Sequence, residues 1–99
     1  MVRIAVDRRK IAMFCRRNRI RRLAFFGSVL RDDFRAGSDV DVLVEFERGA
    51  SVGLIRLAGL ERELSELLGR KVDMNTPGLL SRHFRDAVLK EAEVQYVSA

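Results

Sequence analysis

The chain has 99 residues, of which 47% are hydrophobic and 33% are charged, and its formal net charge is +5 at pH 7. This composition is typical of one small folded domain over residues 1–99 and excludes a largely disordered chain. No apolar run approaches the roughly 20 residues that a membrane-spanning helix needs, so we expect a cytoplasmic protein without a membrane partner. One cysteine and one histidine exclude an internal disulfide and a zinc cluster.

Charge is spread unevenly along the chain. The first 35 residues hold eleven Lys and Arg against three Asp, whereas residues 36–69 hold three Lys and Arg against seven Asp and Glu. A basic first third followed by an acidic middle is typical of a protein that binds a polyanion or an oppositely charged partner. The run over residues 16–22 contains five arginines in seven residues.

Predicted helices and strands alternate from the N-terminus. Asp7 is placed to cap a helix over residues 8–18, whose apolar residues recur on one face. A first strand is predicted over residues 21–26, and a short helix follows Ser28. Residues 35–37 predict a turn, after which the alternating Val-Asp-Val-Leu-Val-Glu-Phe run predicts a second strand over residues 40–46.

The second half continues the same alternation. Ser51 is a candidate cap for the clearest helix of the chain, and Gly69 is placed to end that helix. The apolar residues of this helix recur every three or four positions: Leu57, Leu60, Leu64 and Leu67. A third strand over residues 70–74, a turn over residues 75–78 and one or two helices over residues 79–92 complete the prediction. Strands interleaved with helices in so short a chain predict a small α/β or α+β domain.

Two aspartates, Asp39 and Asp41, stand at the start of the second predicted strand. Because alternate residues of a strand point to the same face, their carboxylates project together, about 6–7 Å apart. Such carboxylates repel each other, and a divalent cation removes the repulsion. Two Mg²⁺ ions about 3.5–4 Å apart, held by shared carboxylates, recur at sites of displacement at phosphorus. Taken alone Asp73 would be a solvated strand end, but beside this pair it is the expected third carboxylate.

The Gly27-Ser28 pair follows the first predicted strand and opens the short helix. Backbone N–H groups and a hydroxyl at a helix N-terminus are an anion site, although a Gly-Ser pair by itself is usually only a turn. Its position after the strand that precedes the aspartates favours a phosphate site facing the same cleft. Arg31 and Arg35 follow, either as solvated charges or as a clamp on a triphosphate.

Gly27-Ser28, followed ten residues later by Ser38 and then by Asp39-Val40-Asp41, resembles the signature of the DNA polymerase β-like nucleotidyltransferase superfamily. With "GSDVDVLVEF" and the later "GRKVDM", nearly the whole chain is similar to the minimal nucleotidyltransferases (MNT) that serve as antitoxins of HEPN/MNT toxin–antitoxin pairs. The resemblance implies a small mixed β-sheet with flanking helices. It also implies an enzyme, a protein adenylyltransferase, that binds ATP with two Mg²⁺ ions and transfers AMP to a tyrosine of a cognate HEPN ribonuclease toxin.

The resemblance also implies roles for individual residues. Those implied for nucleotide binding are Gly27, Ser28, Arg31 and Ser38. Those implied for metal binding and catalysis are Asp39, Asp41 and Asp73, the last near the attacking hydroxyl. Many relatives carry a small residue and a glycine on either side of the arginine, where this chain has Leu30 and Asp32.

Two other functions stay open at this stage. A catalytically weak or inactive antitoxin would mask its toxin by contact, through the apolar residues around Val52, Leu54 and Ile55 or through residues 94–97. For most of these residues we prefer a place in the core. A nucleic-acid-binding regulator would use residues 16–22, with operator DNA bound by the toxin–antitoxin complex, but aromatic residues are missing from that run. Homo- and hetero-oligomers are both compatible with the sequence.

Two further side chains have plain interpretations. Cys15 lies in the apolar register of the first predicted helix, and no histidine lies nearby in the sequence to activate it. We therefore expect a small packed residue and no nucleophile. His83 stands between Arg82 and Phe84, and we expect a surface or partly packed histidine without a catalytic role.

Overall fold

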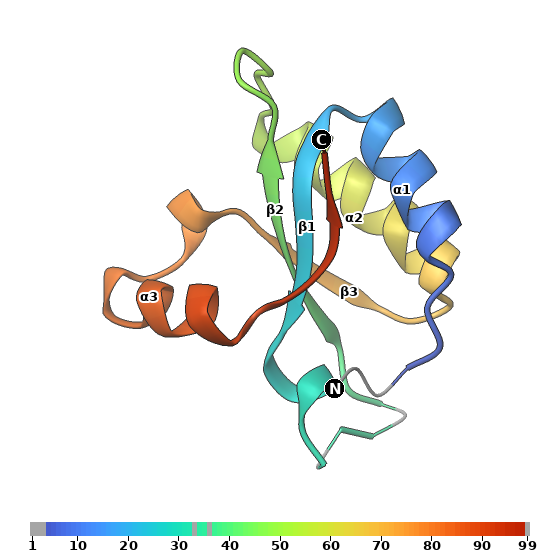
Figure 1. Ribbon diagram of the computed structural model, residues 1–99, viewed down its shortest axis with the longest axis vertical. Coiled ribbons are helices and arrows are strands. Elements are labelled where there is room, and N and C mark those ends of the chain that lie inside the picture. The colour runs from blue at the N-terminus through green and yellow to red at the C-terminus, as the bar shows by residue number, and fades with distance from the viewer. Residues whose placement is uncertain (1–3, 33, 36, 99) are drawn as a thin grey trace.

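In a computed structural model, residues 4–32, 34–35 and 37–98 are described. Within these ranges the chain forms three α-helices, two short 3-10 helices and four strands (Figure 1). In chain order they are α1 (Arg8–Arg17), β1 (Ile20–Phe26), η1 (Gly27–Leu30), β2 (Val40–Phe46), α2 (Leu54–Leu68), β3 (Val72–Asn75), η2 (Pro77–Leu79), α3 (Arg82–Glu91) and β4 (Glu93–Val97). No helix in these ranges is both long enough and apolar enough to cross a membrane.

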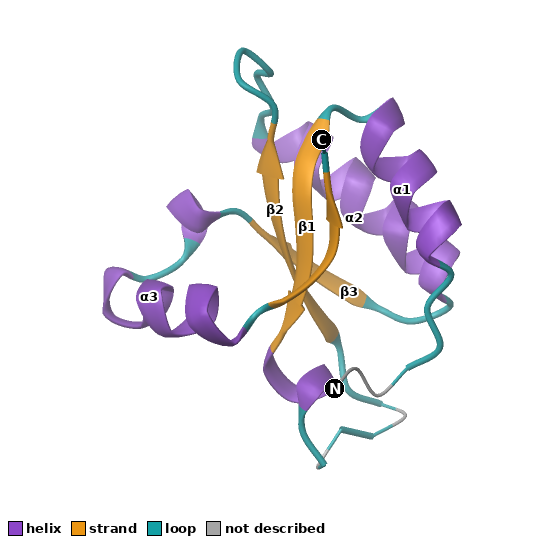
Figure 2. Ribbon diagram, viewed as in Figure 1, coloured by secondary structure: helices purple, strands orange, loops and turns teal. Residues whose placement is uncertain are grey.

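The four strands form one mixed sheet in the order β3-β2-β1-β4. Strand β1 pairs antiparallel with both β2 and β4, whereas β2 and β3 run parallel. The connection between the parallel strands carries α2, as parallel pairs require a crossover. Helices α1 and α2 lie together on one side of the sheet, and α3 lies apart from them (Figure 2). The mixed sheet with flanking helices is the expected fold, and that prediction is confirmed.

The core lies between the sheet and the pair α1 and α2. Along β2, Val40, Val42 and Val44 are fully buried toward this side, because alternate residues of a strand share a face. The helices contribute residues at three- and four-residue spacing: Ile11, Phe14 and Cys15 from α1, and Leu57, Leu60 and Leu64 from α2. A smaller second cluster of buried residues packs α3 on the opposite face: Phe26, Leu43, Leu80 and Val88.

The helix ends agree with the sequence in two places and differ in a third. The Asp7 carboxylate accepts hydrogen bonds from the backbone N–H groups of Arg9 and Lys10, at 3.0 and 3.3 Å, so the predicted cap of α1 is confirmed. Gly69 ends α2 in the left-handed conformation (φ 68°), as predicted. The prediction that Ser51 caps α2 is wrong. The helix starts at Leu54, with Gly53 in an extended conformation (φ −83°, ψ 176°) as its N-cap, and Val52 packs against the core.

The remaining boundaries shift by one or two residues, and one strand was not predicted. Strand β3 begins at Val72 and extends through Asn75, so the predicted turn over residues 75–78 starts one residue later and contains η2. The predicted turn over residues 35–37 includes residue 36, which lies outside the described residues. Strand β4 was missed because its pairing partner β1 lies about 70 residues earlier, which no local pattern reveals.

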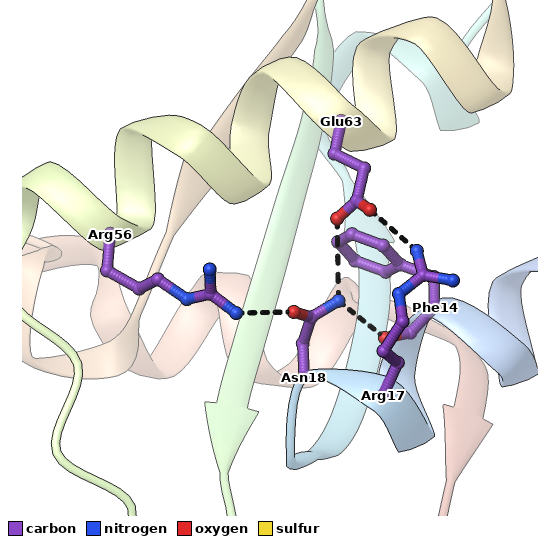
Figure 3. A network of polar contacts seen from close by, with 5 residues as sticks. All are labelled: Phe14, Arg17, Asn18, Arg56 and Glu63. Carbon is purple, nitrogen blue, oxygen red and sulfur yellow. Dashed lines mark hydrogen bonds and ion pairs between the residues drawn. The ribbon is translucent and has the colours of Figure 1, made fainter.

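A polar network fixes the end of α1 against α2 (Figure 3). Its centre is Asn18, which is 8% exposed. The Asn18 side-chain amide donates to the Phe14 carbonyl at 2.8 Å and to Glu63 at 3.5 Å, and its oxygen accepts from Arg56 at 2.8 Å. Glu63 also accepts from Arg17 at 2.6 Å. This buried amide is therefore satisfied by both helices, as a buried polar group requires.

Candidate active site

The three aspartates singled out by the sequence come together at the start of the parallel strand pair. The register of β2 and β3 places Asp41 opposite Asp73, and opposite residues of paired strands share a face of the sheet. Asp39 directly precedes β2, two residues before Asp41, so it returns to that face. Because Val40 and Val42 are buried toward α2, the carboxylates lie on the opposite face, the one that α3 partly covers.

These carboxylates interact electrostatically. Partial burial raises the pKa of Asp41 above its ordinary value, and the charges of Asp73 and then Asp39 raise it further. The Arg31 guanidinium acts in the opposite direction. The expected repulsion between neighbouring carboxylates is thus present, with Asp41 at its centre. A cation at this position would relieve it.

The donor set fits a metal ion that arrives with a phosphate ligand. In the described part of the chain, no three His, Cys, Asp or Glu side chains are arranged as a ready-made metal site. Mg²⁺, however, binds through one or two carboxylates plus substrate phosphates and keeps several waters. Carboxylates from Asp39, Asp41 and Asp73 supply oxygen ligands of the right type, and their mutual repulsion favours a cation.

Gly27 lies directly against the carboxylate of Asp41. Strand β1 ends at Phe26, whose register partner is Asp41, and Gly27 then turns the chain with φ +76°. A Cβ atom at position 27 would collide with the Oδ2 atom of Asp41. Only glycine meets both conditions, the left-handed backbone and the close approach. The expectation that the Gly-Ser turn and the aspartates face each other therefore agrees with the structure.

The short helix predicted after Ser28 is present and begins at Gly27. It is η1, a four-residue 3-10 helix, so few peptide dipoles align and the first-turn N–H groups are not presented as in an α-helix. The dipole contribution of so short a helix is small, and the anion site at this turn stays a prediction. The donors that remain are the Gly27 N–H group and the Arg31 guanidinium. Within the described ranges the Ser28 hydroxyl forms no hydrogen bond and is available to a ligand.

The loop before β2 positions the other predicted residues. The Ser38 hydroxyl accepts a hydrogen bond from the Arg35 N–H group at 3.2 Å, and the Ser38 N–H group donates to the Arg35 carbonyl at 2.9 Å. Ser38 therefore closes the turn that leads into Asp39. The Arg35 carbonyl also accepts from Arg70 at 3.4 Å, so the loop is tied to the start of β3.

Two residues at the site were missed by the sequence analysis. The Lys71 ammonium group lies 3.9 Å from Asp39, and the Glu91 carboxylate lies 3.5 Å from Arg31 and accepts from the Gly27 N–H group at 3.3 Å. Lys71 precedes β3 and Glu91 ends α3, so both reach the site through tertiary packing. The only local signal was their charge, which one third of the chain shares.

The basic run over residues 16–22 is partly neutralised within the chain, by three carboxylates. Arg17 pairs with Glu63, Arg19 with Glu47, and both Arg21 and Arg22 with Glu45, at N–O distances between 2.6 and 3.6 Å. Four of its five arginines thus have carboxylate partners. These ion pairs compete with phosphate for the same guanidinium groups.

Cys15 is fully buried, and burial raises the pKa of its thiol to about 12. This agrees with the expectation of a packed residue, because a thiol that stays protonated is a poor nucleophile.

The mixed sheet, with carboxylates at the start of two parallel strands beside a glycine turn, defines the class of polymerase β-like nucleotidyltransferases. The sequence pattern of the nucleotidyltransferase domain family matches residues 8–95. The chain therefore belongs to this family, among its minimal members. A solved structure described as a candidate minimal nucleotidyltransferase is 39% identical, with a TM-score of 0.70 over 86% of this chain and 85% of that chain.

Relatives named as protein adenylyltransferases or candidate adenylyltransferases match most of the chain. A protein of Methanocaldococcus jannaschii named as a candidate protein adenylyltransferase, MJ0435, is 38% identical over 85 residues, which are 86% of this chain and 89% of that protein. The protein adenylyltransferase MntA of Thermococcus cleftensis is 38% identical over 72 residues, 73% of this chain and 71% of that protein.

Two more distant structures share the fold. A toxin–antitoxin crystal structure with AMP-PNP has a TM-score of 0.76 at 20% identity, over 94% of this chain and 75% of that chain. A complex of tri-AMPylated Shewanella oneidensis HEPN toxin with MNT antitoxin has a TM-score of 0.68 at 20% identity, over 92% and 70%.

Proposed function

We propose that this protein is an antitoxin that transfers AMP from Mg²⁺-bound ATP to a tyrosine of a cognate HEPN ribonuclease and thereby silences it. The observation that carries the proposal is the convergence of Asp39, Asp41 and Asp73 on one face of the sheet, beside Gly27. The relatives named as protein adenylyltransferases support the type of reaction. The structurally similar complex of a tri-AMPylated HEPN toxin with an MNT antitoxin supports a HEPN toxin as the partner.

In the proposed reaction the tyrosyl oxygen attacks the α-phosphorus of ATP. A new oxygen–phosphorus bond forms, the bond to the pyrophosphate oxygen breaks, and the tyrosyl proton leaves to a base. Asp73 is exposed at the edge strand β3 and accepts that proton or orients the hydroxyl. A divalent cation held by Asp39 and Asp41 would neutralise charge on the phosphate oxygens.

The other side chains bind and position the triphosphate. Gly27 has no side chain, so a phosphate oxygen can approach its N–H group beside Asp41. Arg31 contributes a fixed positive charge, and the free Ser28 hydroxyl contributes a donor. Positioning and electrostatic stabilisation supply most of the catalysis in transfers at phosphorus, so a chain of this size is sufficient.

The test is mass spectrometry of the partner encoded by the neighbouring reading frame, after incubation with this protein, Mg²⁺ and ATP. We expect one or more adenylyl groups on a tyrosine of the partner. The variant Asp39→Asn should fold and lose the transfer. Asp86→Asn is the matched control, since Asp86 is exposed on α3 and makes no ion pair among the described residues. Full transfer by Asp39→Asn would refute the proposed role of the carboxylates.

A second candidate, masking of the toxin by contact alone, is favoured by one observation. Leu54 and Ile55, at the start of α2, are 71% and 92% exposed, so the core interpretation is wrong for both. Leu54 lines a groove of about 270 Å³ together with Phe46, Ala50, Val52, Gly53, Leu57, Thr76 and Leu79. Neighbouring exposed apolar residues are typical of a protein interface.

The same incubation without nucleotide separates the two candidates. A masking antitoxin inhibits the ribonuclease without ATP and leaves the partner unmodified. Ile55→Asp should then abolish complex formation, whereas Asp39→Asn should not affect inhibition. Operator binding by the toxin–antitoxin complex stays a prediction, to be tested by the salt dependence of DNA binding.

A further inference from the structure

The carboxylate of Glu91 already occupies two of the donors that the proposed function assigns to the triphosphate, the Gly27 N–H group and the Arg31 guanidinium. Its Oε1 atom accepts a hydrogen bond from the Gly27 N–H group at 3.3 Å and lies 3.5 Å from Nη2 of Arg31. Both contacts join residues 60 or more positions apart in the sequence. A carboxylate oxygen and a phosphate oxygen require the same kind of donor, an N–H group or a guanidinium.

The fold holds Glu91 in this place. Glu91 is the last residue of α3, and β4 begins two residues later with Glu93 paired to Phe25 of β1. The same strand β1 ends one residue before Gly27, so the end of α3 is brought alongside the turn. Behind it, Val88 and Phe26 pack in the smaller core cluster. Glu91 is thus positioned at the site by the sheet register and by the packing of α3.

The contact is held loosely enough to exchange. The side chains of Glu91 and Arg31 are 42% and 58% exposed, and both distances are at the long end of the hydrogen-bond range. An exposed ion pair of this kind contributes little to stability. A triphosphate with its metal ion carries more charge than one carboxylate and would displace it. The two anions cannot share the same N–H group and guanidinium without repelling each other.

We infer that Glu91 is an internal competitor for the nucleotide: its carboxylate occupies the phosphate position in the nucleotide-free protein and is displaced when a nucleoside triphosphate binds. This inference rests on the proposed nucleotide-binding function. Its consequence is that the chain lowers its own affinity for nucleotide. A second consequence is that nucleotide binding releases the end of α3 from the Gly27 turn.

The test compares the affinity of wild-type protein and Glu91→Gln for ATP with Mg²⁺, by isothermal titration calorimetry. The amide of glutamine has nearly the same size and no charge. We expect Glu91→Gln to bind about two- to fivefold more tightly, the range that one exposed ion pair carries. The gain should appear equally with inorganic triphosphate, because the competition concerns phosphate oxygens. Asp86→Asn removes the same charge from the same helix, away from the site, and should bind as the wild type does.

The outcomes separate this inference from the proposed function. If wild type and Glu91→Gln bind ATP equally, or if Asp86→Asn gains as much as Glu91→Gln, the inference is wrong and the nucleotide site stands. Weaker binding by Glu91→Gln also overturns the inference, because it would make Glu91 a ligand of the nucleotide–metal complex. If circular dichroism shows that wild type and Glu91→Gln are both folded and neither binds ATP, the proposed function is wrong and the inference fails with it.

Discussion

Replacing Gly27 by alanine tests how closely the turn and the carboxylate site are joined. The substitution has two separate costs. Alanine at φ +76° adopts a left-handed backbone, which costs about 1–2 kcal/mol. Its Cβ atom would also collide with Oδ2 of Asp41, so the carboxylate must rotate or the turn must shift. Overpacking of this kind costs about 1–3 kcal/mol.

The matched control is Gly49→Ala. Gly49 has φ +88°, and a Cβ atom there meets nothing within 4 Å, so this variant reports the backbone cost alone. We expect Gly27→Ala to lower the free energy of unfolding by about 2–5 kcal/mol and Gly49→Ala by about 1–2 kcal/mol, measured by urea denaturation. For a domain of this size, each kcal/mol corresponds to about 4–8 °C in Tm.

The double variant Gly27→Ala with Asp41→Ala isolates the collision. Removing the carboxylate should restore the part of the stability that Gly27→Ala loses beyond Gly49→Ala, because only the Cβ atom of residue 41 remains nearby. Gly27→Ala should also lose AMP transfer at temperatures where it is fully folded, since Asp41 is displaced. If Gly27→Ala is no less stable than Gly49→Ala and the double variant shows no coupling, the close approach of Gly27 and Asp41 is refuted.

Two other predictions concern pH and the polar network. The pKa of the Asp41 carboxyl group is higher in the folded than in the unfolded chain, so the folded state binds the carboxyl proton more tightly. The free energy of unfolding therefore falls as the pH rises above about 3.8 and Asp41 ionises. Asp41→Asn should therefore raise Tm at pH 7 while abolishing AMP transfer, and this increase in Tm should shrink as the pH falls toward 4. A Tm below that of the wild type at pH 7 would contradict the raised pKa. Asn18→Ala removes the hydrogen bonds to Phe14 and Arg56 and should lower the free energy of unfolding by about 1–3 kcal/mol in urea. A loss below about 0.5 kcal/mol would show that water replaces the amide.

The local elements of this protein follow from the sequence because short-range physics decides them. The alternating run over residues 40–46 predicts β2 at its observed bounds, since one buried face selects a period of two. Asp7 caps the start of α1 as predicted, because its side chain bonds to N–H groups only two or three residues away. Gly69 ends α2 as predicted, because a glycine in the left-handed conformation needs no distant partner. The pairing of Asp39 with Asp41 on one face follows from the same two-residue period.

Contacts between distant segments were decided only by the tertiary structure. Strand β4 exists because β1 offers it a free edge, and Asp73 meets Asp41 because of the β2–β3 register. Glu91 reaches Gly27 from the far end of α3, although nothing near it in the sequence points to the site. The physical reason is the same in each case: local propensity acts over a few residues, whereas strand pairing and packing depend on which distant surfaces the completed core brings together.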